Sequence, residues 1–191
     1  ASLVVASGGL SIPKMGGSGF GYDLARQFGM NIIPTRAGLV PFTFTGGHEE
    51  FMARLAGVSV PVRLATGGQA FVDDMLFTHH GLSGPAALQL SSYWVDGAAI
   101  TVDLLPQLSA GEYLLDIKRR QPRLLLRTVL MEHLPRALVQ SLESLWWPVY
   151  ADKALAEWPD RVLTEVAHQL AHWTMTPSGT EGYRTAEVTW G

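Results

Sequence analysis

Glycine punctuates the first 21 residues of the chain more densely than an ordinary loop requires. The apolar run Leu3-Val-Val-Ala6 leads into Gly8 and Gly9, and a second glycine cluster at 16–21 precedes a helical pattern over 22–28. This order predicts a buried parallel strand, a tight turn, a glycine-rich loop and a helix. Because Gly8 and Gly9 lack a Cβ atom, backbone amides there can approach a phosphate or a planar cofactor closely, although a ligand-free turn explains the same spacing.

Segments in the same order along the chain resemble those of the HI0933-like flavoproteins. They are Ala6-Ser-Gly-Gly9 with the Ser11-Ile-Pro-Lys14 that follows it, and the stretches 34–42, 76–90 and 176–189. In this family the first segment runs along an FAD cofactor, so the resemblance implies a cofactor-binding role for Ala6, Ser7, Gly8 and Gly9. Ser7 departs from the family's usual threonine at that position.

The resemblance also implies that parts of the family's cofactor domain are missing from this sequence. Family members begin with a strand and a Gly-x-Gly-x-x-Gly turn that holds the pyrophosphate of FAD, and they end with a further glycine-rich segment. Residues 1–191 contain neither. The sequence is therefore interpreted as an internal fragment, the middle portion of an FAD-dependent oxidoreductase.

That enzyme is expected to pass reducing equivalents from NAD(P)H through flavin to a small organic acceptor. The whole protein is expected to be an enzyme, whereas this fragment alone is expected to be inactive and to hold no cofactor, because the pyrophosphate-binding turn is absent.

The period of the hydrophobic pattern changes along the chain and predicts an α+β fold in four parts. Residues 1–41 are interpreted as a remnant of the FAD domain, and 42–108, with short alternating runs between glycine turns, as a barrel-like antiparallel β subdomain. Residues 109–173 are expected to form a small helical subdomain, and 174–191 a hairpin that returns to the FAD domain. The two ends of such an insert should lie side by side.

Local signals refine these parts. Ser83-Gly-Pro85 is expected to begin a helix with Ser or Gly capping it and Pro in its first turn. Ser109 and Glu112 have the spacing of a capping box. Prolines divide the helical stretch into short helices; they are Pro122, Pro135, Pro148 and Pro159.

His79 is the candidate catalytic residue, because it lies in a turn directly before a predicted helix. A neutral imidazole there can donate a proton during a reduction. The alternative is that His79 only shapes the turn, since no partner carboxylate is identifiable in the sequence. His168 and His172 share a helix face but lack an intervening glutamate and a third ligand, so no metal site is predicted.

The composition of the chain limits the kinds of binding partner that we expect. The net charge of -3 provides no long-range attraction for nucleic acid or an anionic membrane, and the absence of cysteine fits a cytoplasmic protein. The expected partners are a small-molecule substrate and the missing halves of the FAD domain, with no nucleic acid and no membrane.

One local feature runs against this expectation, because basic residues gather within 118–127. They are interpreted as a solvated helix face. The alternative is a non-catalytic interaction module whose helical part docks a protein or a nucleic acid. The residues are Lys118, Arg119, Arg120, Arg123 and Arg127.

Overall fold

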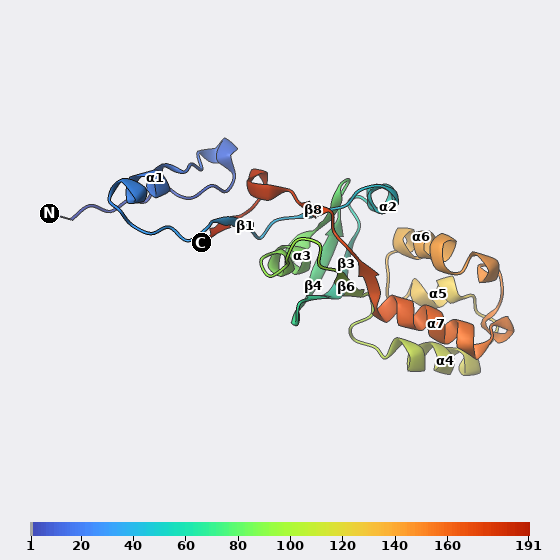
Figure 1. Ribbon diagram of the computed structural model, residues 1–191. Coiled ribbons are helices and arrows are strands. Elements are labelled where there is room, and N and C mark those ends of the chain that lie inside the picture. The colour runs from blue at the N-terminus through green and yellow to red at the C-terminus, as the bar shows by residue number, and fades with distance from the viewer. Residues whose placement is uncertain (1) are drawn as a thin grey trace.

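The computed structural model describes residues 2–191, which form an elongated molecule of three parts in a row (Figure 1). The N-terminal part contains a short 3-10 helix, η1 (Pro13–Met15), and α1 (Phe20–Gln27). An antiparallel sheet with two helices lies in the middle, and a helical subdomain lies at the far end. The predicted α+β class is confirmed.

The central sheet has seven antiparallel strands in the order β7-β6-β3-β4-β5-β2-β8. Its two edge strands are separated by only residues 176–178, so a span of at most about 14 Å connects Met175 to Gly179 and forces the sheet to curl. No ladder joins β7 to β8 within residues 2–191, so the predicted barrel is a curled, open sheet. The strands are β2 (Phe42–Thr43), β3 (Ser59–Thr66), β4 (Gln69–Phe77), β5 (Gly81–Ser83), β6 (Ile100–Asp103), β7 (Trp173–Met175) and β8 (Gly179–Thr180).

The hairpin of β3 and β4 is built as its sequence indicates. Val60, Val62 and Leu64 alternate with exposed residues along β3 and are buried in the core. Gly67 and Gly68 connect the two strands with φ angles of 53° and 82°, the two positive values that a type I′ turn requires. The hairpin therefore presents one apolar face to the interior of the curl.

Two helices cover this sheet. Helix α2 (Gly47–Arg54) lies against β5, and α3 (Gly84–Ser91) packs on β3 and β4. Pro85 lies in the first turn of α3 as predicted, but the Ser83 side chain makes no capping hydrogen bond. At the C-terminal end of α3, the hydroxyls of Ser91 and Ser92 accept hydrogen bonds from the backbone N–H groups of residues 40 and 39, at 3.0 and 3.1 Å.

The helical subdomain contains α4 (Ala110–Arg120), α5 (Leu126–Leu130), α6 (Arg136–Trp146) and α7 (Asp160–Ala171). Pro135 and Pro159 directly precede α6 and α7, and Pro148 begins a 3-10 helix, η2 (Pro148–Tyr150), so the prolines do divide the helices. The predicted capping box is wrong. Ser109 occupies the N-cap position of α4 without a side-chain hydrogen bond.

Trp173 of β7 joins the sheet to the helical subdomain. Its ring makes edge-on contacts with Phe51 of α2 and Trp146 of α6, with centroid distances of 5.5 Å in both cases. The backbone N–H of Leu104 also donates to the carbonyl of Leu170 at 2.9 Å. The buried side chains of both parts form one continuous core.

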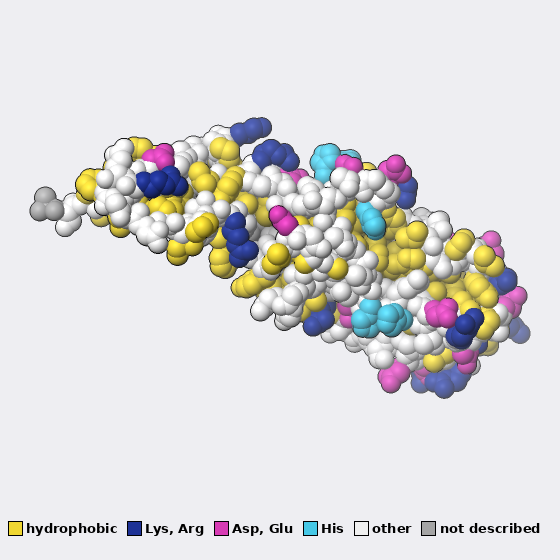
Figure 2. Space-filling view, in the orientation of Figure 1, with side chains coloured by type: hydrophobic (Ala, Val, Ile, Leu, Met, Phe, Trp, Pro, Cys, Tyr) yellow, Lys and Arg dark blue, Asp and Glu magenta, His cyan; other side chains and the backbone are white. Residues whose placement is uncertain are grey.

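The two ends of the chain leave the central part side by side, as expected of an insert. β1 (Arg36–Gly38) pairs with β9 (Val188–Trp190) in a separate antiparallel ladder (Figure 1). Farther out, apolar side chains of the N-terminal part reach the surface (Figure 2). No helix within residues 2–191 is long and apolar enough to cross a membrane.

Two predictions for the chain ends are wrong. Residues 3–6 form no strand, and Leu3 and Val4 are 78% and 84% exposed, because no strand of the described chain pairs with them. Residues 174–191 form no hairpin either. Strands β7, β8 and β9 pair with β6, β2 and β1, so each run completes a different ladder, and a 3-10 helix, η4 (Gly182–Arg184), separates β8 from β9.

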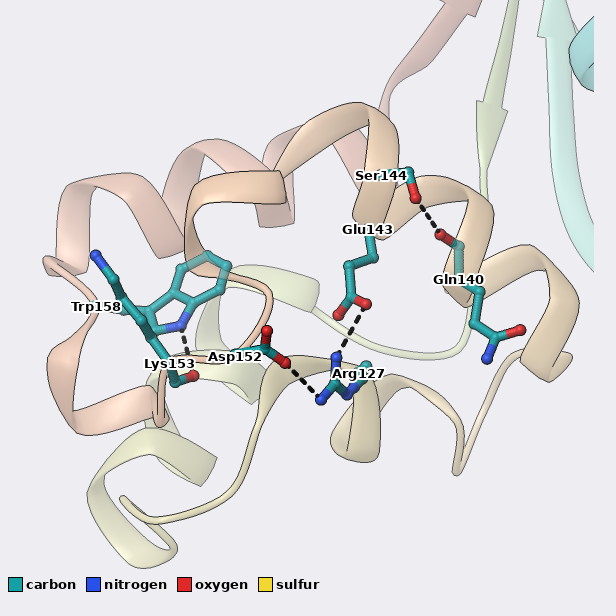
Figure 3. Close-up of polar contacts among 7 residues, drawn as sticks. All are labelled: Arg127, Gln140, Glu143, Ser144, Asp152, Lys153 and Trp158. Atoms are coloured by element: carbon teal, nitrogen blue, oxygen red, sulfur yellow. Dashed lines mark hydrogen bonds and ion pairs between the residues drawn. The ribbon is translucent and has the colours of Figure 1, made fainter.

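Arg127 of α5 bridges two carboxylates of the helical subdomain, those of Glu143 and Asp152 (Figure 3). Its guanidinium donates to Asp152 at 2.9 Å and to Glu143 of α6 at 3.1 Å. These two hydrogen bonds raise the pKa of Arg127 above its ordinary value. The Glu143 side chain is only 13% exposed, so Arg127 neutralises a carboxylate that is mostly removed from water.

We expect Arg127→Ala to lower the urea midpoint of unfolding, because Glu143 would lose its counter-charge. The matched control is Arg123→Ala, which removes an exposed arginine from the same segment and should leave the midpoint unchanged. A second substitution, Glu143→Ala, should recover part of the loss in the double variant. Equal midpoints for Arg127→Ala and Arg123→Ala would show that the bridge does not stabilise the subdomain.

Candidate cofactor site

The glycine turn lines a cavity of about 610 Å³ where the two ends of the chain meet. All four residues predicted to bind the cofactor, Ala6, Ser7, Gly8 and Gly9, contribute to it. The far end of the chain contributes residues that the sequence did not identify, because nothing in their local pattern shows which loop they contact. These are Glu187, Val188 and Thr189.

Thr189 of β9 holds the glycine turn in place. Its Oγ1 accepts hydrogen bonds from the backbone N–H groups of Leu10 at 3.0 Å and Ser11 at 3.2 Å. It also lies 2.8 Å from Ser11 Oγ. Farther along, the Ile12 N–H donates to the carbonyl of Tyr183 at 2.9 Å. The turn is thus shaped by residues about 180 positions away in the sequence.

The close packing of this loop explains why it needs glycine. Gly8 has a φ of 74°, a left-handed conformation that L side chains rarely adopt. A Cβ atom on Gly9 would lie 2.8 Å from Thr189 Oγ1, and one on Gly17 would lie 2.2 Å from the carbonyl oxygen of Ser11. Glycines therefore let three backbone segments come together around the cavity.

The lining offers polar groups to a ligand with ribose hydroxyls, such as the FAD that the sequence predicts. Ser7 Oγ is buried and has no hydrogen-bond partner within residues 2–191, which leaves a polar group that a ligand can satisfy. Glu187 is the acidic member of the lining and suits a ribose hydroxyl better than a phosphate. The residues present can therefore hold part of a flavin dinucleotide.

His79 does not line this cavity. It is exposed in the turn between β4 and β5, and the hydrogen bonds that close this turn run between Thr78 and Gly81, at 2.8 and 3.1 Å. The neighbouring His80 has the carboxylate partner that the sequence did not reveal, because its Nδ1 lies 3.2 Å from Glu49 Oε1. The role of His79 as a proton donor stays a prediction.

The other candidate side chains form no metal site. The rings of His168 and His172 stack with centroids 4.5 Å apart, and His172 Nδ1 lies 3.3 Å from the carbonyl oxygen of His168. Within the described chain, no group of three or more His, Cys, Asp or Glu side chains is arranged to hold a metal ion.

The basic residues of the helical subdomain divide into two sets. Lys118 is engaged by Asp160 and the carbonyl oxygen of Trp158, and Arg127 lies in the bridge described above. By contrast, residues 119–123 form an exposed segment where α4 ends. Arg119 and Arg120 both face Asp116, at 3.8 and 2.9 Å, and Arg123 forms no ion pair within residues 2–191.

The family model described as "HI0933-like protein barrel and H2TH domain" matches residues 36–188. A ribosomal RNA dihydrouridine synthase of Escherichia coli K12 is 46% identical over 190 residues, which cover 99% of this chain and 47% of the relative. A ribosomal RNA dihydrouridine synthase of Haemophilus influenzae is 42% identical over 193 residues, which cover 100% of this chain and 47% of the relative.

These relatives correct two predictions. The expected small organic acceptor is wrong, because proteins this similar across the whole chain act on ribosomal RNA. The expected absence of a nucleic-acid partner is wrong for the same reason. A net charge of -3 is a sum over the whole chain and does not exclude a local contact with nucleic acid.

Two broader predictions, of an enzyme and of the family, agree with the comparisons. The relatives are enzymes, in agreement with the enzyme predicted from the sequence. The chain spans about half the length of the curated relatives that it matches. The matched residues 36–188 include the curled sheet and the whole helical subdomain. By this match, the chain belongs to the HI0933-like family.

Proposed function

We propose that the protein to which this chain belongs reduces uridine in ribosomal RNA to dihydrouridine. The observation that carries this proposal is the identity of 46% and 42%, across essentially the whole chain, to two ribosomal RNA dihydrouridine synthases. Since the chain covers 47% of each relative, the activity is proposed for the intact protein. The chain would contribute part of the cofactor site and part of the RNA-binding surface.

The chemistry is a two-electron reduction of the C5–C6 double bond of uracil. The base gains a hydride at one carbon and a proton at the other, so the reaction needs a hydride donor and an acid. A reduced flavin bound in the glycine cavity would supply the hydride and would be oxidised in the process, and NAD(P)H remains the expected source of its electrons.

This chain's own residues would bind and orient the cofactor. Gly8 and Gly9 allow the backbone to approach it, Ser7 Oγ offers an unpaired hydroxyl, and Thr189 fixes the turn through the N–H groups of Leu10 and Ser11. His79 remains a candidate for the proton donor.

A large RNA substrate also accounts for the exposed arginines at the far end of the molecule. Arg119, Arg120 and Arg123 present three guanidinium groups against the single carboxylate of Asp116. A shallow groove of about 320 Å³ lies between Arg120 and Arg123. Guanidinium groups bind phosphate through paired N–H donors, so we propose that this segment contacts the RNA backbone.

The activity is tested with the intact protein, FAD, NADPH and ribosomal RNA that lacks dihydrouridine. We expect a uridine to gain two hydrogens, detected by mass spectrometry of RNA fragments, with one reduced nicotinamide consumed for each. Chemically reduced flavin in place of NADPH is the control for the electron source. Unmodified RNA in both reactions would contradict the proposed function.

The RNA contact is tested by replacing Arg119, Arg120 and Arg123 with alanine together. We expect weaker binding of ribosomal RNA and a slope of log affinity against log salt that is shallower by about 2–3, as expected for three lost phosphate contacts. Arg63→Ala is the matched control, because Arg63 is an exposed arginine on β3 without an ion pair in the described chain. An unchanged salt slope in the triple variant would place the RNA elsewhere.

A further inference from the structure

A second cavity, of about 540 Å³, lies next to the glycine cavity. The two cavities share Val188 and Thr189 of β9 as lining residues. Their linings nevertheless differ in chemistry. The glycine cavity is lined mainly by small and polar residues, whereas the second is lined by large aromatic side chains, and we call it the aromatic pocket. Its aromatic residues are Phe71, Tyr93 and Trp190.

These three aromatic rings form a row that is open to solvent. Tyr93 lies between the other two, with its centroid 5.6 Å from that of Phe71 and 6.1 Å from that of Trp190. Tyr93 is 46% exposed and Trp190 is 40% exposed. The Arg36 guanidinium lies over the Trp190 ring, 5.4 Å from its centroid. A row of accessible rings ending in a cation is the kind of surface on which proteins stack unpaired RNA bases.

The polar groups of the pocket can hydrogen-bond the edge of a uracil base. Gln89 Nε2 donates to the carbonyl oxygen of Pro85 at 3.1 Å, so its carbonyl Oε1 is the group that can accept a hydrogen bond from a ligand. Tyr93 contributes a phenolic O–H donor. Uracil presents an N3–H donor between two carbonyl acceptors, so an acceptor and a donor in the lining of the pocket can both bond its edge.

We propose that the aromatic pocket receives the target uracil of the RNA after it leaves its base stack. This inference rests on the proposed function and assigns the substrate base to named residues. Because the pocket shares two residues with the cofactor cavity, a base stacked on Tyr93 lies beside the site proposed for the flavin. Hydride transfer requires such proximity of the reacting atoms. Arg36 would hold the Trp190 ring and face the RNA chain next to the target base.

The test uses the intact protein and labelled oligo(U). Tyr93→Leu should weaken oligo(U) binding roughly tenfold, because the central ring is lost. Tyr93→Phe should retain the stacking. Gln89→Leu should weaken oligo(U) binding less than Tyr93→Leu does, because it removes a hydrogen-bond acceptor and leaves the rings in place.

The control is Val72→Ala, which changes an exposed side chain that neighbours Phe71 along β4 but does not line the pocket. It should leave binding, flavin content and dihydrouridine formation unchanged. Dihydrouridine formation is measured for each variant, with Tyr93→Leu expected to raise the KM for RNA while the protein keeps its flavin.

The outcomes separate this inference from the proposed function. If the unmodified protein makes dihydrouridine and Tyr93→Leu and Gln89→Leu behave like it, the assignment of the base to this pocket is overturned. Loss of flavin from Tyr93→Leu overturns it as well, because the pocket would then belong to the cofactor. Absence of dihydrouridine with the unmodified protein overturns the proposed function, and oligo(U) binding by the variants still reports on the pocket.

Discussion

The hydrogen bonds of Thr189 hold together the part of the molecule on which the candidate site depends. Its hydroxyl accepts from Leu10 and Ser11, and the strand that carries it, β9, pairs with β1. The turn at residues 6–9 and the strand at 188–190 would otherwise be separate, exposed segments. Joined in this way, the turn and the strand line the glycine cavity. Val188 and Thr189 of the same strand also line the aromatic pocket. A single strand therefore positions both proposed ligands.

The rest of the chain supplies a rigid support at a distance from that site. The curled sheet and the helical subdomain share one core through Trp173, so the exposed arginines at 119–123 are held in a fixed direction relative to the sheet. The segments that line the glycine cavity lie toward one end of the elongated molecule, and the helical subdomain forms the other end (Figure 1). A small acceptor would use only the cavity. A ribosomal RNA is large enough to contact both regions, which fits the activity of the relatives.

Local patterns predicted those features whose cause is local. Alternation identified β3, because each of its apolar residues reaches the same face of the sheet regardless of its neighbours. Prolines marked the starts of α6 and α7, because proline has no N–H to donate inside a helix and its ring clashes with the preceding turn. Gly8 and Gly9 predicted a tight turn, and Gly8 has the positive φ, 74°, that such a turn favours. In each case the physical reason lies within a few residues.

Features that depend on distant partners were missed or predicted wrongly. The apolar run 3–6 has the composition of a strand, but a strand also needs a neighbour for its backbone hydrogen bonds. The aromatic row draws on β4, on the turn that follows α3 and on β9, so no sequence window contains it. A nucleic-acid partner was wrongly excluded, because the basic residues at 118–127 were interpreted as a solvated helix face and the net charge of -3 supported that interpretation. Resemblance identified the family correctly, and only the close relatives pointed to the substrate.

The most direct test of this account is the flavin affinity of the intact protein with Thr189→Val. Valine keeps the shape of threonine and favours a strand, but it offers no acceptor for the N–H groups of Leu10 and Ser11. Losing two such hydrogen bonds should weaken flavin binding roughly ten- to thirtyfold. Thr101→Val, in β6 and outside both cavities, is the matched control and should bind flavin normally. Equal affinity of the Thr189→Val variant and the unmodified protein would contradict the claim that the two chain ends together build the cofactor site.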